Sequence, residues 1–136
     1  MIDTKLRLRI GAVLHFIIAA GHLACLFFLD EAFRAFNILE EMTQLSFGLA
    51  WLPYAITVAL SLAFAAAGFC ALSTAGDIRP LPLQRLVVIA VVVAYSLRAL
   101  IGFASLFWAF SLLELFSSLA PAFIVWCYWP GMSAKK

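Results

Sequence analysis

The residues of this sequence that could do chemistry are a few polar side chains that lie inside or at the ends of long apolar stretches. They are His22, Tyr54, Tyr95, Arg98 and Glu114. A charge at bilayer depth costs from about 2.5 kcal/mol upward, so such a side chain is expected to face other helices and to find a partner there. We therefore predict that these five residues line a polar pocket.

Helix geometry places members of this predicted pocket at similar depths. Arg98 follows Arg85 by 13 residues, and His22 follows Arg9 by the same number. In a helix each interval is about 20 Å long. Glu114 lies in the last apolar run, about one turn below the outer surface of the membrane. It is the best acidic partner for Arg98. The sequence thus predicts a polar cluster in the outer half of a helical bundle.

Three interpretations of Arg98 remain open at this point. It could hold an anionic headgroup, a quinone or a small acid in a pocket. It could instead form one ion pair with Glu114 that fixes the register of two helices. A third possibility is that its aliphatic stem lies in the membrane while the guanidinium reaches the outer interface.

The histidines and cysteines do not predict a metal or cofactor site. His15 and His22 project from the same side of one helix about 10 Å apart, so they cannot share a metal ion or sandwich a haem within one chain. The three cysteines, Cys25, Cys70 and Cys127, are isolated in apolar runs and resemble neither a disulfide framework nor a thiolate metal site. We expect no cofactor and no metal.

Catalytic and nucleic-acid functions are not expected either. The sequence has no glycine-rich phosphate loop, no GxSxG motif and no HExxH motif. The net charge of +2 comes from charges scattered at the ends of apolar runs and not from a basic patch. We therefore do not expect an enzyme or a nucleic-acid-binding protein.

The elements that must position the polar residues are four apolar runs, each about as long as the roughly 20 residues that a span needs. They cover residues 10–29, 47–72, 86–107 and 110–129. With 66% hydrophobic and 12% charged residues, the 136-residue chain predicts a single all-α membrane domain of four antiparallel transmembrane helices. The first run is longer than a signal-peptide core, so we expect it to be retained.

The charges between the runs predict an orientation. Basic residues in short loops mark the cytoplasmic side of a membrane. Seven of the nine basic residues fall on one side of a four-span chain: Lys5, Arg7, Arg9, Arg79, Arg85, Lys135 and Lys136. The first loop, on the other side, is mainly acidic. We expect a multi-pass protein of a bacterial-type inner membrane with both termini in the cytoplasm.

The first loop, residues 30–46, carries a helical signal of its own. Phe33, Phe36, Leu39 and Met42 recur every three residues and alternate with polar residues. This pattern is typical of a short helix that lies in the membrane interface. The third connection carries little signal, and we expect a tight turn within residues 105–111.

Small residues predict which faces of the helices touch, because close backbone approach holds helices together in lipid. The second run has Ser61, Ala65 and Gly68 at helical spacing, flanked by further alanines. Ala20 and Ala24 form a comparable patch on the first run.

Three hypotheses about function follow. The first is a small accessory or binding protein whose pocket takes a small molecule, a quinone or a lipid headgroup. The second is a small oligomeric transporter or flippase-like protein, and the third is a structural subunit of a larger membrane complex. The partners expected are the lipid bilayer and, according to the hypothesis, a small-molecule or lipid ligand, further copies of the chain or another membrane protein.

In size and number of spans the chain is similar to small bacterial four-helix membrane proteins, including drug transporters and flippase-like proteins. The transporters of this size carry a membrane-embedded glutamate in their first span. The first span here contains only histidines at that depth, so no functional residue is carried over.

Overall fold

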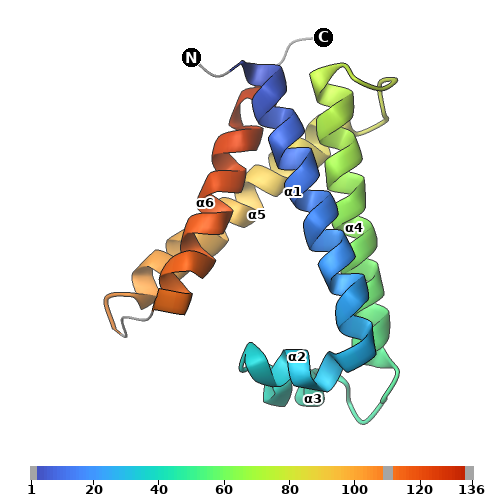
Figure 1. The fold of residues 1–136 in the computed structure, drawn as a ribbon, viewed down its shortest axis with the longest axis vertical. Coiled ribbons are helices and arrows are strands. Elements are labelled where there is room, and N and C mark those ends of the chain that lie inside the picture. The colour runs from blue at the N-terminus through green and yellow to red at the C-terminus, as the bar shows by residue number, and fades with distance from the viewer. Residues whose placement is uncertain (1–2, 109–111, 134–136) are drawn as a thin grey trace. The chain divides into compact units, whose positions relative to one another are not determined.

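The protein is all-helical, and four of its helices are long and apolar enough to cross a membrane (Figure 1). The computed structural model describes residues 3–108 and 112–133, without the side chains of residues 113 and 114. The helices are α1 (Thr4–Cys25), a 3-10 turn η1 (Leu26–Phe28), α2 (Leu29–Ala35), α3 (Leu39–Leu45), α4 (Leu52–Ala75), α5 (Gln84–Ser105) and α6 (Leu112–Met132). The prediction of four membrane-spanning helices is confirmed.

The helix ends differ from the predicted runs for local reasons. Helix α1 begins six residues earlier than predicted, because Lys5, Arg7 and Arg9 are good helix formers although they are not apolar. Helix α4 begins at Leu52 and not near residue 47, because Phe47 and Gly48 both have a positive φ angle that no α-helix accommodates. Helix α5 ends at Ser105, and the predicted turn within residues 105–111 lies partly outside the described residues.

The first loop forms two short helices where the sequence predicted one. Helices α2 and α3 are separated at Asn37, whose φ angle of +56° lies in the left-handed region. Ile38 N–H donates to Phe33 O at 2.9 Å, the bond that closes a helix end when the preceding residue is left-handed. The apolar spacing therefore predicted helical structure correctly. Asn37, however, divides the segment into two helices that form a helical hairpin.

The chain divides into two compact units, and both α1 and α4 contribute to each of them. The first unit contains Met1–Leu14 and Ala67–Lys136, and the second contains His15–Ala66. The first therefore holds the start of α1, the end of α4 and the α5–α6 pair. The second holds the remainder of α1 and α4 with the α2–α3 hairpin.

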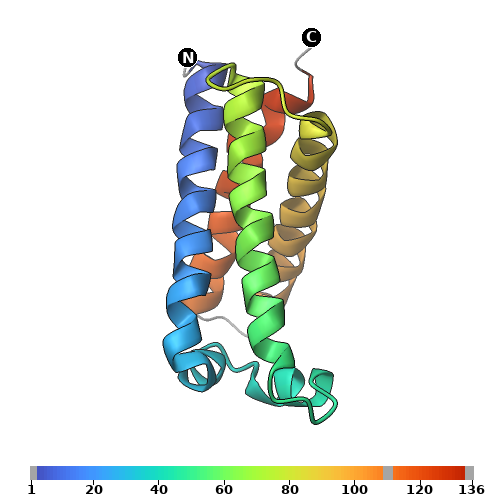
Figure 2. The ribbon, with the colours of Figure 1, turned by 90° about the vertical axis from the view of Figure 1, so that its right-hand side faces the viewer.

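In the first unit, glycines allow the helices to approach closely. A Cβ atom on Gly11 of α1 would lie 2.6 Å from the Tyr128 ring of α6, and Tyr128 in turn donates its hydroxyl to Ala67 O of α4 at 3.2 Å. A Cβ atom on Gly131 would meet Leu8 at 3.1 Å and Val88 at 3.2 Å. Helices α5 and α6 pack against each other in this unit (Figures 1 and 2).

In the second unit, α1 and α4 lie side by side and share a polar contact. Ser61 of α4 is buried and donates its hydroxyl to Ala19 O of α1 at 2.8 Å. The predicted role of Ser61 as a packing residue agrees with this contact. On α1, however, the predicted patch of Ala20 and Ala24 is exposed, and Ala19 provides the close approach.

Candidate functional site

The candidate site is an apolar cavity of about 380 Å³ in the second unit. Its wall combines three groups of residues: Ile18, Gly21, His22 and Cys25 of α1, Ile56, Thr57 and Leu60 of α4, and the inner face of the α2–α3 hairpin. The hairpin contributes Leu29, Ala32, Phe33, Phe36, Ile38 and Met42. The volume lies within the range of small-molecule pockets, which is about 300–1,000 Å³.

His22 is the basic side chain at this cavity. Its Nδ1 atom lies 2.8 Å from Ile18 O in the preceding turn of α1. Since a carbonyl oxygen only accepts hydrogen bonds, this contact places a proton on Nδ1. The neutral ring then presents Nε2 as an acceptor, and the protonated ring presents it as a donor.

The position of the His22 ring is fixed by Phe64 of α4. The two ring centroids are 4.9 Å apart with an interplanar angle of 52°, a tilted geometry that aromatic pairs favour. His15, one heptad earlier, is fully buried and lies 6.0 Å from the same phenyl ring. The two histidines therefore share one face of α1, as predicted, but His22 alone lines the cavity.

The other polar groups in the wall are Thr57 and Cys25. The Thr57 hydroxyl donates to Pro53 O of its own helix at 2.8 Å, so its proton is already used. The Cys25 sulfur is a weak hydrogen-bonding group that behaves largely as a small apolar one. The cavity therefore offers an apolar volume with one strong polar group, His22.

The orientation of the hairpin's inner face is set by the backbone turn at Asn37, where α2 ends. The left-handed residue turns the chain so that Phe33 and Ile38, on either side of it, both face the cavity. Phe33 is only 9% exposed. Of the four apolar residues that predicted this segment as helical, Leu39 is the one that lies elsewhere, in a hollow on the opposite, polar face.

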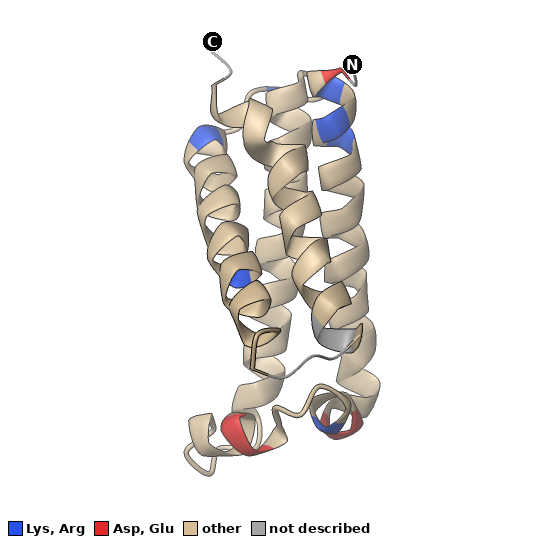
Figure 3. Cartoon of the chain, turned by 90° about the vertical axis from the view of Figure 1, so that its left-hand side faces the viewer, with Lys and Arg blue, Asp and Glu red and all other residues tan. Residues whose placement is uncertain are grey.

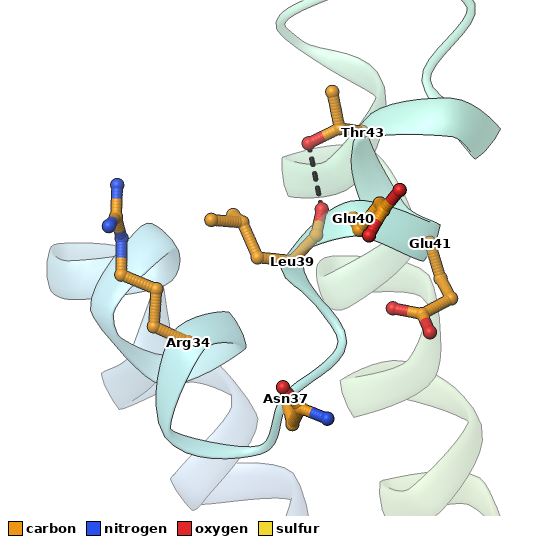
Figure 4. Close-up of a pocket in the computed structure, with 6 residues that line it drawn as sticks. All are labelled: Arg34, Asn37, Leu39, Glu40, Glu41 and Thr43. Carbon is orange, nitrogen blue, oxygen red and sulfur yellow. Dashed lines mark hydrogen bonds between the residues drawn. The ribbon is translucent and has the colours of Figure 1, made fainter.

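That second hollow is open, and most of the residues that line it are polar. It is lined by Arg34, Asn37, Leu39, Glu40, Glu41 and Thr43, and all but Leu39 are exposed. Figure 4 shows Arg34 and the two glutamates on different sides of it, with Thr43 donating to Leu39 O at 2.7 Å. Acidic residues mark both short helices in Figure 3. We interpret this hollow as the solvated side of the hairpin.

The five residues of the predicted pocket are divided between the two units. His22 and Tyr54 belong to the second unit, whereas Tyr95, Arg98 and Glu114 belong to the first. Tyr54 is 46% exposed and does not line the cavity. Tyr95 is half-buried in α5. A polar cluster that joins all five remains a prediction.

Arg98 has a polar contact on α6. Its Nη2 atom donates to Ser117 Oγ at 3.4 Å, and its side chain is exposed. The predicted partner, Glu114, lies in α6, but its side chain is outside the described residues. The Arg98–Glu114 pair therefore also remains a prediction.

Sequence reasoning did not find the residues that shape the cavity. Gly21, Thr57 and Phe33 were not among the predicted site residues, and Cys25 was treated only as an isolated cysteine outside any disulfide or metal site. The detectable signal was the spacing of Ile18, Gly21, His22 and Cys25, which places four residues on one side of α1. Among the described residues, no group of three or more His, Cys, Asp or Glu side chains could hold a metal ion.

The four long apolar helices define the class of protein, an all-helical membrane protein with four candidate spans. Comparison of the chain with protein-family models, with curated proteins and with solved structures found no match. The cavity is therefore the feature of this chain from which a function can be proposed.

Proposed function

We propose that this protein is a small binding protein of a bacterial-type inner membrane that holds a lipid-soluble molecule with one polar end, a quinone being the class that fits best. The observation that carries the proposal is the cavity of about 380 Å³ with His22 in its apolar wall. We propose binding and not catalysis, because a single imidazole has no second acid, base or nucleophile placed beside it by a described contact.

The lining favours a neutral polar end over a charged one. No Lys or Arg occurs among the described residues that line the cavity. An anionic headgroup in this apolar site would have no cation other than a protonated His22, and an unpaired buried charge is costly. A quinone carbonyl can accept a hydrogen bond from Nε2 of the protonated ring, and a quinol hydroxyl can donate to Nε2 of the neutral ring.

The position of the cavity supports a ligand that arrives from the lipid. His22 lies near the end of α1 that leads into the acidic hairpin. It is about 25 Å along the helix from Lys5, which lies at the basic end of α1. If basic residues mark the cytoplasmic side, the cavity belongs to the outer half of the membrane. We propose that both termini are cytoplasmic and that the hairpin covers the cavity at the outer interface.

Filling the cavity at Gly21 tests the proposal. A Cβ atom at Gly21 meets nothing within 4 Å, and Gly21 lines the cavity. Gly21→Leu should therefore occupy the ligand volume without a clash, and it should not weaken α1 because glycine is a poor helix former. Binding of decylubiquinone, measured by isothermal titration calorimetry in detergent, should weaken at least tenfold.

The matched control is Ala20→Leu. Ala20 is the neighbouring residue of α1, is exposed and does not line the cavity, so this variant should bind decylubiquinone like the parent protein. His22→Phe should keep the volume approximately and remove the polar group, which predicts binding about tenfold weaker. Equal affinity of the parent and Gly21→Leu would show that the quinone does not bind in this cavity.

A further inference from the structure

Arg98 occupies a position at which its side chain would ordinarily point into the middle of the membrane. It lies seven residues before the end of α5 at Ser105, which is about 10 Å along the helix. Side chains on a helix lean toward its N-terminus. For Arg98 this direction leads away from the nearer end of the helix.

Gly102 allows the opposite direction. A Cβ atom on Gly102 would clash with the Ser118 hydroxyl of α6 and would lie 3.0 Å from Nη1 of Arg98. The space beside Gly102 is therefore shared by Ser118 and the guanidinium, which lies one turn closer to the end of α5 than Arg98 itself. The level of residue 102 is only about 5 Å from that end. Beyond it, Phe107 is 92% exposed and Trp108 is 93% exposed, as expected for aromatic residues at a membrane interface.

The guanidinium has donors to spare at this level. It carries five N–H donors, and Ser117 Oγ, at 3.4 Å, is its one acceptor among the described residues. Its side chain is exposed. An exposed cation with open donors, within reach of the headgroup level, matches the phosphate of a lipid in charge and in geometry.

We propose that Arg98 and Ser117 form a binding site for the phosphate group of a membrane phospholipid, with Gly102 as the notch that lets Arg98 reach it. The guanidinium donates to the phosphate oxygens while the acyl chains lie along the apolar surface of α5 and α6. This site is independent of the cavity at His22. The competing arrangement is an ion pair between Arg98 and Glu114, which would neutralise the Arg98 charge and engage two of its five donors.

Native mass spectrometry of the full-length protein in detergent tests the site. The probes are phosphatidylglycerol and, as a lipid without phosphate, diacylglycerol with the same acyl chains. The parent protein should retain phosphatidylglycerol in preference to diacylglycerol. Arg98→Gln should lower the affinity for phosphatidylglycerol about fivefold, since a cation near the lipid surface contributes about that factor.

Three controls accompany this variant. Arg34→Gln removes an exposed arginine of α2 and should leave the binding of phosphatidylglycerol unchanged. Arg98→Lys keeps the charge and should retain more lipid than Arg98→Gln. If Arg98→Gln does not fold in detergent, Ser117→Ala removes only the second group and should lower retention by a smaller factor.

Three results would overturn the site. One is equal retention of phosphatidylglycerol by the parent and Arg98→Gln, as the Arg98–Glu114 pair predicts. Another is equal retention of diacylglycerol and phosphatidylglycerol by the parent. The third is displacement of the lipid by millimolar inorganic phosphate, which would show that the site takes free phosphate and not a phospholipid.

Discussion

Arg7 compensates for a proline in another helix. Pro130 lies inside α6 and has no N–H group, so Trp126 O, four residues earlier, lacks its ordinary helical donor. Arg7 of α1 donates Nη2 to this oxygen, and its guanidinium carbon lies 4.2 Å from the centroid of the Trp126 ring. One side chain thus satisfies a carbonyl and forms a cation–π contact.

This arrangement predicts that Arg7 and Pro130 are energetically coupled. Pro130→Ala restores an N–H donor to Trp126 O, so Arg7 loses one of its two contacts in that background. Arg7→Ala should therefore destabilise the parent by about 1–3 kcal/mol and the Pro130→Ala variant by less. Thermal melting in detergent of the two single variants and the double variant measures the coupling. Additive effects would contradict it.

The Arg9–Asp77 ion pair depends on the end of α4. Gly76 has a φ angle of +84°, and the next N–H, of Asp77, donates to Leu72 O at 3.0 Å, which closes the helix as a Schellman motif. Asp77 then accepts from Arg9 Nε at 2.8 Å and from Nη2 at 2.5 Å. These hydrogen bonds, and next the positive charge of Arg9, lower the pKa of the exposed Asp77 carboxyl.

The lowered pKa of Asp77 gives a pH-dependent prediction. A carboxyl whose pKa is lower in the folded state stabilises the fold above its unfolded pKa of about 3.9, and this contribution is lost as the pH falls through the folded value. At pH 7, Asp77→Asn should lower the melting temperature by about 1–4 °C, because exposed pairs contribute little. The difference from the parent should disappear well below pH 4. A difference that persists at that acidity would assign the effect to something other than the carboxylate.

At the scale of elements, the α2–α3 hairpin is the part of the fold that makes the cavity. Its two helices have only seven residues each, too few to be stable alone in water. The burial of Leu29, Ala32 and Phe33 within the second unit therefore supports them. The residue that sets the angle between the two helices is Asn37, with its left-handed backbone.

We predict that the hairpin tolerates glycine at position 37 but not a β-branched residue. Asn37→Gly can adopt a positive φ angle, whereas Asn37→Val is strained there by about 1–2 kcal/mol. Hydrogen–deuterium exchange in peptides that cover residues 29–45 should rise for Asn37→Val and stay near the parent level for Asn37→Gly. Equal exchange in both variants would mean that the turn does not hold the hairpin.

For the whole molecule, the distribution of charge predicts the orientation in the membrane. The first turns of α1 contain Lys5, Arg7 and Arg9, and α2 begins with Asp30 and Glu31. Helix α1 is about 33 Å long, close to the thickness of the hydrocarbon core. The basic and acidic groups on either side of this helix therefore belong to different faces of the membrane, and the basic face is expected to be cytoplasmic.

Reporter fusions test this orientation. A fusion after Lys136 should be active with a cytoplasmic reporter and inactive with one that requires export, and an insertion at Asn37 should give the reverse result. Moving the basic residues of α1 to the α2–α3 hairpin should weaken or invert this preference. Activity of an exported reporter at Lys136 would contradict both the orientation and the number of spans.

The sequence by itself determined the class of the protein, the four spans and the helical nature of the first loop. These follow from composition and from apolar periodicity, which act on each segment alone. It also identified His22 as a polar residue that needs an explanation, because a histidine in an apolar run is conspicuous without any partner.

Only the tertiary structure decided what surrounds each polar residue. The cavity exists because Gly21 and Cys25 of α1, Thr57 of α4 and Phe33 of the hairpin meet, and no periodicity relates residues on different helices. Likewise, the sequence does not show that the Arg98 side chain lies beside Gly102, because this depends on the direction that the side chain takes. A run of apolar residues specifies that a helix enters lipid, whereas the residues that meet depend on how backbones pack, since lipid itself favours no particular face.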